Sequence, residues 1–405
     1  MPLLECLART WDHIHRNLFP WLTEELGPLS EAHKQVVVAI EVADLEGVVQ
    51  TWSGEPGRPP RDRVALARAF LAKAVLDLPT TVMLIDRLEV DRPLRRLCGW
   101  ETVKQIPGES TFSRAFAEFA ASGLPVRVHE ALVRRTYQGR LVGHIARDAT
   151  AIEAREKPVR IAASSSAQAS TRARASTRAQ PPAEGAAPKR KRGRPKKGEV
   201  VAPKEASTSA QPSRLARQAS MSLPQMLADL PTHCAVGAKR NAKGHTVRWI
   251  GYKLHLDIAD GDIPISAILT SASVHDSQAA IPLATITAKR VTNLYDLMDA
   301  AYDAAEITAG SIALGHVPII DTNPRNTAGL KQAIATEAQA QRSAGYTLAE
   351  DRRYNQRSSC ERVNGSIKDN YGARHIRVRG HAKVFCHLMF GILALTAHQL
   401  MRMVT

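Results

Sequence analysis

The stretch TVRWIGYKLHLDIADGDIPISAILT, residues 246–270, decides the fold of this chain. Its first half places apolar side chains on one face at every second position: Ile250, Tyr252, Leu254, Leu256 and Ile258. A period of two is that of a β-strand. Asp260-Gly261 supplies the chemistry of a tight turn, and residues 263–270 alternate again. The stretch therefore predicts a hairpin of two antiparallel strands.

Further elements flank this hairpin along the chain. Upstream, residues 141–152 (LVGHIARDATAI) are rich in β-branched residues and predict a strand. Downstream, the expected elements in chain order are a helix over 277–289, a strand over 294–298, another helix, a strand over 317–320, and two long helices over about 355–370 and 382–403. This order predicts an α/β fold in which helices flank a mixed sheet.

Residues 1–140 predict a small all-α domain. Apolar residues recur at three- and four-residue steps through 64–78, which is the helix period, and Pro79 ends that pattern. The segment 106–114 (IPGESTFSR) predicts a turn, then a Ser or Thr N-cap, then a helix. Short helices with such a turn fit a DNA-binding bundle. They also fit a helical packing domain, because sequence fixes a helix-turn-helix geometry poorly.

Residues 157–222 differ in composition from the rest of the chain. Small, polar and basic residues dominate, so the segment cannot bury enough surface to offset chain entropy and is expected to be a disordered linker. Residues 157–220 carry 15 Lys or Arg and 3 Glu, a net +12 of the chain's +16. The charge signal for a polyanionic partner therefore comes from this linker, through counterion release.

Within the linker, the run KRKRGRPKKG at 189–198 has an Arg-Gly-Arg-Pro core that resembles an AT-hook. Glycine lets the backbone lie deep in a narrow groove, and the flanking cations reach the negative potential of A·T tracts. The predicted DNA contacts are Arg192, Arg194 and Lys196. Non-specific attraction to phosphates is the alternative.

Cysteine usage and the apolar runs indicate a reduced, cytoplasmic setting. The five cysteines are scattered and form no CxxC pair, which argues against a disulfide framework or a cysteine-rich zinc site. The N-terminal MPLLECLARTWDH has acidic residues and no apolar core, so a secretory signal is not expected. The most apolar run, 384–401, contains two histidines and indicates a buried helix rather than a membrane span.

Three carboxylates stand where metal-dependent phosphodiester chemistry would need them. Asp148 lies in the upstream strand, Asp299 follows the strand at 294–298, and Glu361 lies on a late helix. Such chemistry needs a few carboxylates converging on two divalent ions about 4 Å apart, which activate the attacking oxygen and stabilise the leaving oxygen. Because Mg²⁺ prefers oxygen ligands and keeps several waters, two or three protein carboxylates suffice.

The late helix predicts one face that collects four side chains of different chemistry. Arg357 and Glu361 are four residues apart. Lys368 lies seven residues further on, and Tyr354 lies three before Arg357. An Arg–Glu pair alone would fit a surface ion pair, and Tyr354 and Lys368 in register weaken that interpretation. In a DNA complex the two cations would hold phosphates, and the tyrosine could stack on a base or sugar.

The run Tyr354-x2-Arg357-x3-Glu361-x6-Lys368 resembles the signature of bacterial insertion-sequence DDE transposases. Other segments agree with that resemblance: RDATAIEA around Asp148, GYKLHLDIADGDIPISAILTSASVHDS at 251–277, and LMDAAYD around Asp299. The helical N-terminal part is also similar to the domain that precedes the catalytic core in these enzymes. The resemblance covers most of the chain outside the linker, and the signature run is its most specific part.

The resemblance implies a ribonuclease-H-like core that binds two Mg²⁺ ions, with Mn²⁺ substituting. Members of the family hydrolyse a DNA strand at the element ends, and the freed 3′-hydroxyl then attacks target DNA. Double-stranded DNA, as terminal inverted repeats and as target, is the implied partner, a homodimer is the implied active form, and the bacterial nucleoid is the implied place. The implied catalytic metal ligands are Asp148, Asp299 and Glu361, and the implied end-DNA contacts are Tyr354, Arg357 and Lys368.

The expected parts of the chain are a helical DNA-binding domain (1–140), the first core strand (141–156), the disordered basic linker (157–222), and the remaining core with its C-terminal helix (223–405). The linker therefore interrupts the core and must loop out from the sheet. Only 61 residues separate Asp299 from Glu361, which is few for the large strand-rich insertion that some relatives carry there.

Four other polar residues have competing interpretations. Glu153 is expected as an exposed charge at a strand end rather than a ligand. Asp276 would cap the next helix or support the metal site. Arg325 would lie near DNA or in a plain turn, and His144 is expected to be a satisfied histidine rather than a ligand. Two other functions also remain open: a transposase-derived DNA-binding protein without chemistry, and a nuclease of the same fold that does not join strands.

Overall fold

The computed structural model describes most of the 405 residues, namely 3–49, 61–159, 212–240, 244–324 and 327–405. The described residues before and after the long central gap belong to one compact unit. The AT-hook-like run at 189–198, with Arg192, Arg194 and Lys196, lies outside the described residues, as does Arg325.

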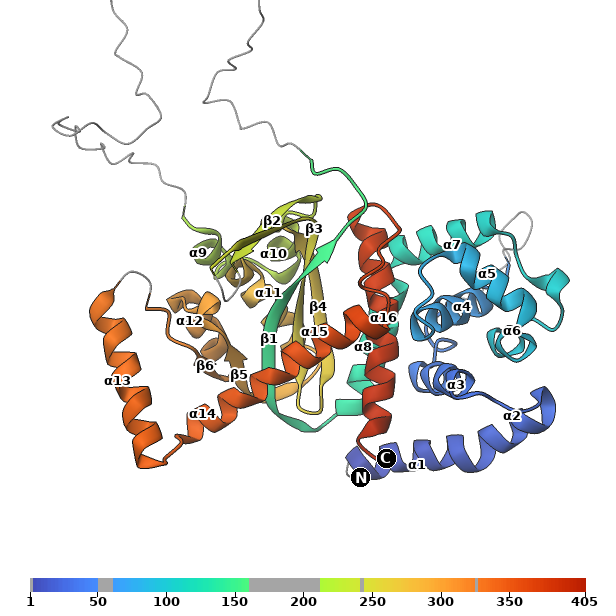
Figure 1. The fold of residues 1–405 in the computed structure, drawn as a ribbon, viewed down its shortest axis with the longest axis horizontal. Helices are drawn as coiled ribbons and strands as arrows, with labels where there is room; N and C mark the ends of the chain where they lie inside the picture. Colours follow the sequence, from blue (N-terminus) through green and yellow to red (C-terminus); the bar gives the residue numbers. More distant parts are fainter. Residues whose placement is uncertain (1–2, 50–60, 160–211, 241–243, 325–326) are drawn as a thin grey trace, which may run out of the picture. The chain divides into compact units, whose positions relative to one another are not determined.

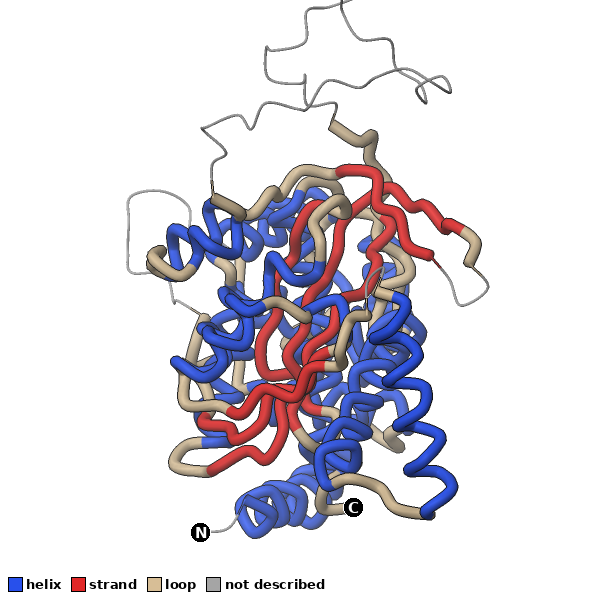
Figure 2. Tube along the Cα trace, turned by 90° about the vertical axis from the view of Figure 1, so that its left-hand side faces the viewer, coloured by secondary structure: helices blue, strands red, loops and turns tan. Residues whose placement is uncertain are grey.

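A mixed sheet of six strands lies at the centre of the C-terminal part (Figures 1 and 2). Its strands are β1 (Leu141–Glu153), β2 (Ala235–Arg240), β3 (Thr246–Ala259), β4 (Ile263–Ser271), β5 (Thr292–Met298) and β6 (Val317–Ile320). The order is β2-β3-β1-β5-β6, with β4 also paired to β3. β3 is antiparallel to β1, β2 and β4, whereas β5 is parallel to β1 and to β6.

The hairpin predicted at 246–270 is present as β3 and β4. The turn between them uses Gly261 and Asp262, whose φ angles of 83° and 63° are left-handed. Leu254 and Leu256 are fully buried, as the alternation predicts. Ile250 is exposed instead, since β3 pairs there only with β2 in a ribbon that extends beyond the rest of the sheet (Figure 2).

Helices cover both faces of the sheet, which confirms the predicted α/β class. One face packs against α15 (Ser358–Asn370) and α16 (His381–Arg402), in a core that includes Leu254, Leu256 and Leu297. The other face is covered by shorter helices, which are α10 (Leu223–Asp229), α11 (Ala280–Ala288) and α12 (Ala305–Ala313). A 3₁₀ turn (Asp276–Ala279) leads into α11, where the helix over 277–289 was expected.

The N-terminal part is all-helical, as predicted. Its helices are α1 (Leu3–His13), α2 (Phe19–Leu26), α3 (Glu31–Ala43), α4 (Arg63–Val75), α5 (Thr81–Val90), α6 (Arg92–Cys98), α7 (Glu109–Ser122) and α8 (Leu124–Tyr137), with a π-helical turn (Ile14–Leu18) between α1 and α2. The expected Ser or Thr N-cap of α7 is wrong, because Gly108 holds that position. The prediction that these helices bind DNA stays a prediction.

The helix α16 joins the N-terminal helices to the sheet. The ring of Phe390 lies 5.9 Å from that of Phe70 in α4 and 6.5 Å from that of Phe119 in α7. Residues of α16 also belong to the core beneath β3. By length and composition α16 could cross a membrane, but 78% of its most apolar window is buried inside the protein. This burial confirms the expected core helix.

Some elements lie where the sequence predicts none. Helix α9 (Arg214–Gln218), α10 and β2 come before residue 246, so folded structure resumes earlier than expected. Residues 214–218 fall inside the expected linker, yet Gln218 donates a hydrogen bond to the carbonyl of Gln278 beside α11. The exposed helix α13 (Ala328–Ala344) and the short α14 (Ala349–Tyr354) also precede the predicted late helix.

Candidate active site

Asp148 and Asp299 lie side by side on neighbouring strands. β1 and β5 are parallel, with Arg147 opposite Met298, so the next residues in each strand are also in register. Adjacent strands lie about 4.8 Å apart. Asp299 directly follows β5 and caps a 3₁₀ turn, where its Oδ1 accepts a hydrogen bond from the Ala301 amide (2.9 Å). The sheet therefore brings two of the three predicted carboxylates together.

Burial of the Asp148 carboxylate raises its pKa to about 6. Asp299 adds to that rise, and the Arg357 guanidinium, 3.9 Å from Oδ1, opposes it. The other oxygen accepts a hydrogen bond from the Asn364 amide (3.0 Å). Burial disfavours a carboxylate's charge unless cations or donors compensate it, and here the compensation is incomplete. A cation placed between Asp148 and Asp299 would complete it.

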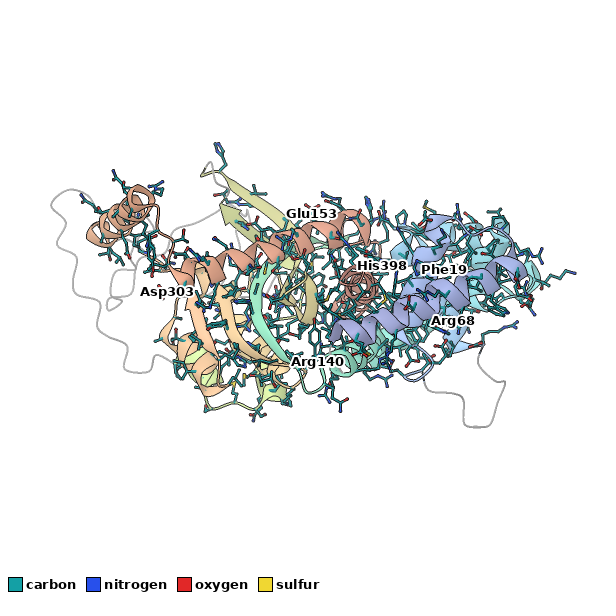
Figure 3. The ribbon with its side chains drawn as sticks, turned by 90° about the horizontal axis from the view of Figure 1, so that it is seen from below. Phe19, Arg68, Arg140, Glu153, Asp303 and His398 are labelled. Carbon is teal, nitrogen blue, oxygen red and sulfur yellow. The ribbon has the colours of Figure 1, made fainter. Side chains whose placement is uncertain are left out.

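Helix α15 lies across β1 (Figure 3), and its Asn364 and Lys368 side chains reach β1 through hydrogen bonds. Both belong to a stripe of residues three and four apart, namely Arg357, Glu361, Asn364 and Lys368. Lys368 Nζ donates a hydrogen bond to Thr150 Oγ1 (2.6 Å). By its spacing Glu361 belongs to the same stripe, at an exposed position of α15.

The Glu361 side chain is exposed to solvent and makes no hydrogen bond among the described residues. Within the described part of the chain, no three His, Cys, Asp or Glu side chains are grouped to hold a metal ion. The two aspartates are thus together, and the glutamate lies on the adjacent helix without joining them. The triad as a metal site stays a prediction.

The chemistry of the donors nevertheless fits a hard divalent cation. Carboxylate oxygens suit Mg²⁺ and Mn²⁺, which keep part of their water shell. Beside Asp148, the Oδ1 atom of Asn364 is buried with no hydrogen-bond partner in the described structure. A hydrated cation at this place would supply donors to that oxygen and charge to Asp148. Asp148, Asp299 and Glu361 would hold it.

The sequence predicts that the signature residues share one helix face, but in the structure they lie on three successive elements. Tyr354 ends α14, a 3₁₀ turn (Asn355–Arg357) follows, and α15 begins at Ser358. The Arg357 guanidinium lies 5.9 Å from the centre of the half-buried Tyr354 ring, a cation–π contact. Tyr354 therefore supports Arg357 from the preceding helix, and the expected single face is corrected to a stripe that starts at Arg357.

A buried ion pair lies under the site and was not predicted. Arg147 and Asp257 are directly opposite on β1 and β3 and form a bidentate pair with distances of 2.7 and 2.8 Å. Thr287 Oγ1 donates a further hydrogen bond to Asp257 (2.6 Å). Both charged side chains are at most 1% exposed. Because successive residues of a strand point to opposite faces, anchoring Arg147 on one face presents Asp148 on the other.

Asn364 and Thr150 are further residues that sequence reasoning missed. Asn364 lies three residues after Glu361 and four before Lys368, so its place on the stripe could have been read from spacing alone. Thr150 lies two residues after Asp148, on the same face of β1. Their polar side chains complete the hydrogen bonds between α15 and β1.

The remaining candidates are not brought to the site as ligands. Glu153 is an exposed charge at the end of β1, as expected (Figure 3). Asp276 is wrong as a helix cap, because His275 holds that position and Asp276 pairs with Lys253 (2.7 Å). His144 Nδ1 pairs with Asp260 (3.0 Å) toward the start of β1, but its Nε2 is buried without a hydrogen-bond partner among the described residues, so the expected satisfied histidine is met at one ring nitrogen only.

Two family models match the chain. Residues 228–397 match one described as "Transposase DDE domain", and residues 24–118 match one described as "Transposase domain (DUF772)". No curated protein and no solved structure matches the chain significantly. The catalytic match includes Asp299 and Glu361 but begins after β1, and the pairing of β1 with β3 and β5 adds Asp148 to that domain.

The fold and the two matches define the class: a DNA transposase with a ribonuclease-H-like catalytic domain. Together the two matches indicate an insertion-sequence DDE transposase. Members of this family generally use divalent metal ions and act on DNA, which agrees with the oxygen-rich site between β1, β5 and α15.

Proposed function

We propose that this transposase cuts a DNA strand at the ends of its element and joins the freed 3′-hydroxyl to target DNA. The observation that carries the proposal is the in-register pair Asp148 and Asp299 beneath the stripe of α15 that contains Glu361. Two Mg²⁺ or Mn²⁺ ions held there would activate the attacking oxygen and stabilise the leaving oxygen.

The chain's own residues would bind and orient the DNA. Arg357 and Lys368 lie on either side of Glu361 and carry charge suited to the phosphates next to the scissile bond. Asn364 orients the Asp148 carboxylate through its amide. In the first step a water oxygen bonds to phosphorus and the 3′ oxygen leaves as a hydroxyl. In the second step that hydroxyl attacks a target phosphate, whose own 3′ oxygen leaves.

We also propose the DNA substrates, the oligomeric state and the cellular location of the protein. Terminal inverted repeats and target DNA would be the two substrates, and the pairing of two element ends would require at least a homodimer. The protein would act in the bacterial cytoplasm, at the nucleoid. Arg192, Arg194 and Lys196 of the linker would add contacts in the minor groove of A·T-rich DNA.

One reaction separates this proposal from its two rivals. The full chain is mixed with Mg²⁺, target DNA and a labelled element end that carries a free 3′-hydroxyl. Joined product, seen as a longer labelled strand, supports the transposase. Cleavage without joining supports a nuclease of the same fold, and binding without either product supports a DNA-binding protein that has lost its chemistry.

Lys368→Ala is expected to weaken binding to the element end and to lower the dependence of log Kd on log salt by about one. The change removes one ammonium that would neutralise a phosphate. Fluorescence anisotropy over a series of NaCl concentrations measures both quantities. Thr150→Val is the matched control, since it removes the hydrogen-bond partner of Lys368 and keeps the charge. Equal salt dependence in Lys368→Ala and the wild type would remove Lys368 from the DNA contacts.

Asn364→Ala is expected to raise the Mg²⁺ concentration needed for half-maximal cleavage by roughly 10- to 100-fold, as for other residues that orient a metal ligand. The reason is the loss of the hydrogen bond that fixes Asp148. Titrating Mg²⁺ in the cleavage assay measures the shift, and the melting temperature is followed in parallel. A purely structural Asn364 would lower the melting temperature and leave the Mg²⁺ requirement unchanged, which would contradict the positioning role.

A further inference from the structure

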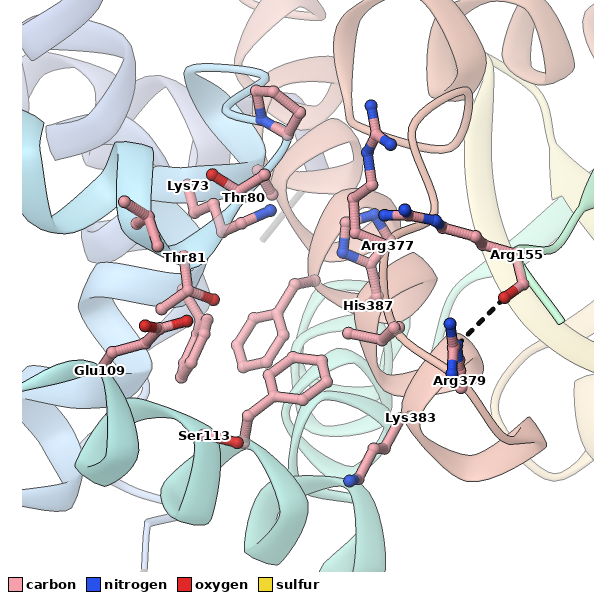
Figure 4. Close-up of a pocket in the computed structure, with 17 residues that line it drawn as sticks. Lys73, Thr80, Thr81, Glu109, Ser113, Arg155, Arg377, Arg379, Lys383 and His387 are labelled. Carbon is pink, nitrogen blue, oxygen red and sulfur yellow. Dashed lines mark hydrogen bonds between the residues drawn. The ribbon is translucent and has the colours of Figure 1, made fainter.

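A cavity of about 560 Å³ lies between the N-terminal helices and the far end of β1 (Figure 4). Helices α4, α5 and α7 form one wall, and the other is formed by α16, the segment that leads into it, and Arg155. Five cationic side chains line it: Lys73, Arg155, Arg377, Arg379 and Lys383. Glu109 is the one carboxylate among the lining residues, and it is exposed.

These five cations form no ion pair with a carboxylate in the described part of the chain. Arg379 donates a hydrogen bond to the carbonyl oxygen of Arg155 (3.2 Å), drawn in Figure 4. The adjacent Glu156 is occupied elsewhere, since its carboxylate accepts hydrogen bonds from Tyr252 (2.7 Å) and from the Gly380 amide (3.3 Å). The cavity therefore gathers an excess of positive charge: five cations face one lining carboxylate, Glu109, and Asp77 acts on Lys73 from beyond the lining.

The cavity differs in this respect from the rest of the helical part. There, several arginines that face other elements are paired with carboxylates, as in Arg63–Glu118, Arg68–Glu46 and Arg135–Asp44. Lys73 is the most buried cation of the cavity, with 8% of its surface exposed, and burial lowers its pKa to about 8. Burial makes the charge of this ammonium costly, and an anion that enters from solvent would offset that cost.

The arrangement fits a run of phosphates better than a single small anion. The cations come from both walls: Lys73, Arg155 and Arg377 point toward the region of His387, and Arg379 and Lys383 lie further along the cavity (Figure 4). DNA offers such a run, because a duplex carries a negative charge about every 1.7 Å along its axis. The four cations other than Lys73 are exposed, as contacts to a backbone that approaches from outside require.

The distance between the cavity and the Asp148 carboxylate also suits a DNA duplex. Arg155 follows Asp148 by seven residues along and just past β1, which spans at most about 23 Å at 3.3 Å per residue. That length corresponds to roughly seven base pairs at 3.4 Å per step. Thr150 and Lys368 lie between the two places, so a duplex could run from one to the other along the stripe of α15.

We propose that this basic cavity binds backbone phosphates of the DNA end, roughly seven base pairs from the phosphate that lies at Asp148. The inference rests on the proposed function, because the catalytic carboxylates locate the duplex. It assigns a DNA-holding role to a surface built jointly by the N-terminal helices and the catalytic domain. Phosphate contacts of this kind position DNA and do not read its sequence.

The test compares two double variants of the full chain by anisotropy with a labelled 30-base-pair duplex of arbitrary sequence, in EDTA, over a NaCl series. Arg155→Ala/Arg377→Ala removes two exposed cations of the cavity. Arg127→Ala/Lys289→Ala removes two exposed cations from α8 and beside α11, away from the cavity and from α15. The cavity variant is expected to bind roughly tenfold more weakly at 100 mM NaCl and to lower the salt slope by about two, with the control unchanged.

A second measurement locates the contact without any mutation. Lysines are acetylated in the free protein and in its complex with the same duplex, and the modified sites are identified by mass spectrometry. DNA is expected to protect the exposed Lys383 and to leave the exposed Lys289 reactive. Equal losses in the two double variants, or no protection of Lys383, would overturn the inference. If strand joining by the wild type persists in that case, the proposed function stands. If the wild type binds no duplex at all, both fail.

Discussion

Glu361→Gln is expected to reduce strand cleavage and joining by at least about a thousandfold, because metal ions supply several kcal/mol to the transition state and each 1.4 kcal/mol is a factor of ten. Glutamine keeps the size of the side chain and loses the negative charge that a divalent ion needs. Binding to the element end should stay within about threefold, since the phosphate-holding cations remain. Denaturing gels of a labelled end with Mg²⁺ measure cleavage and joining, and fluorescence anisotropy measures binding to the end.

The matched control is Glu153→Gln, which removes the same charge from the exposed end of β1. It should cleave at the wild-type rate. Retained activity in Glu361→Gln would rule out Glu361 as the third ligand. Another residue would then have to complete the metal site with Asp148 and Asp299. An equal fall in both variants would show that the loss of a negative charge near DNA, and not the loss of a ligand, controls the rate.

Asp257→Asn is expected to lower the free energy of unfolding by about 3–5 kcal/mol, since it leaves the Arg147 guanidinium buried without its counter-charge. Chemical denaturation followed by circular dichroism measures the change. The effect on catalysis should be large as well, because Arg147 precedes Asp148 on β1 and fixes which face that carboxylate occupies.

The control for this prediction is Asp262→Asn, which breaks the bidentate pair between Asp262 and the exposed Arg362. Asparagine tolerates the left-handed φ of that turn residue, and exposed pairs contribute about 1 kcal/mol or less. The double variant Arg147→Met/Asp257→Leu should recover part of the lost stability, since an apolar pair removes both charges of this ion pair, while the nearby buried Asp296 keeps its pairing with His316. Equal unfolding free energies for Asp257→Asn and the wild type would contradict the role assigned to this pair.

Much of the sheet could be predicted because strands of this kind carry strong local signals. The alternation at 246–270, the β-branched run before Asp148 and the apolar run before Asp299 all become strands with nearly the expected bounds. The late apolar run becomes α16, whose burial agrees with the sequence. In each case one face of the element is buried against the core, and the spacing of its apolar residues indicates that face.

Other elements escaped prediction because their stability comes from contacts rather than pattern. β2 (AVGAKR) is a short edge strand rich in small and basic residues, held by its pairing with β3. Helix α13 is exposed along nearly its whole length and has no broad apolar face. The division of the chain into an N-terminal domain and a core was likewise expected from composition, whereas α16 packs against both parts.

Part of the candidate site followed from sequence and part did not. Asp299 and Glu361 could be chosen from residue type and spacing, and the register of β1 with β5 then places Asp148 beside Asp299. The break before Ser358, the hydrogen bond from Asn364 and the ion pair of Arg147 depend on how strands and helices meet in space. The periodicity of a single sequence does not predict these contacts between distant elements.

Metal-directed cleavage of the protein backbone tests whether Asp148, Asp299 and Glu361 hold one metal centre. Fe²⁺ replaces Mg²⁺ in the complex with an element end, and ascorbate with peroxide then generates radicals at the bound ion. We expect cuts near all three residues, on β1, after β5 and on α15, which excess Mg²⁺ suppresses. Cuts near Asp148 and Asp299 without one on α15, or cuts confined to other segments, would contradict it.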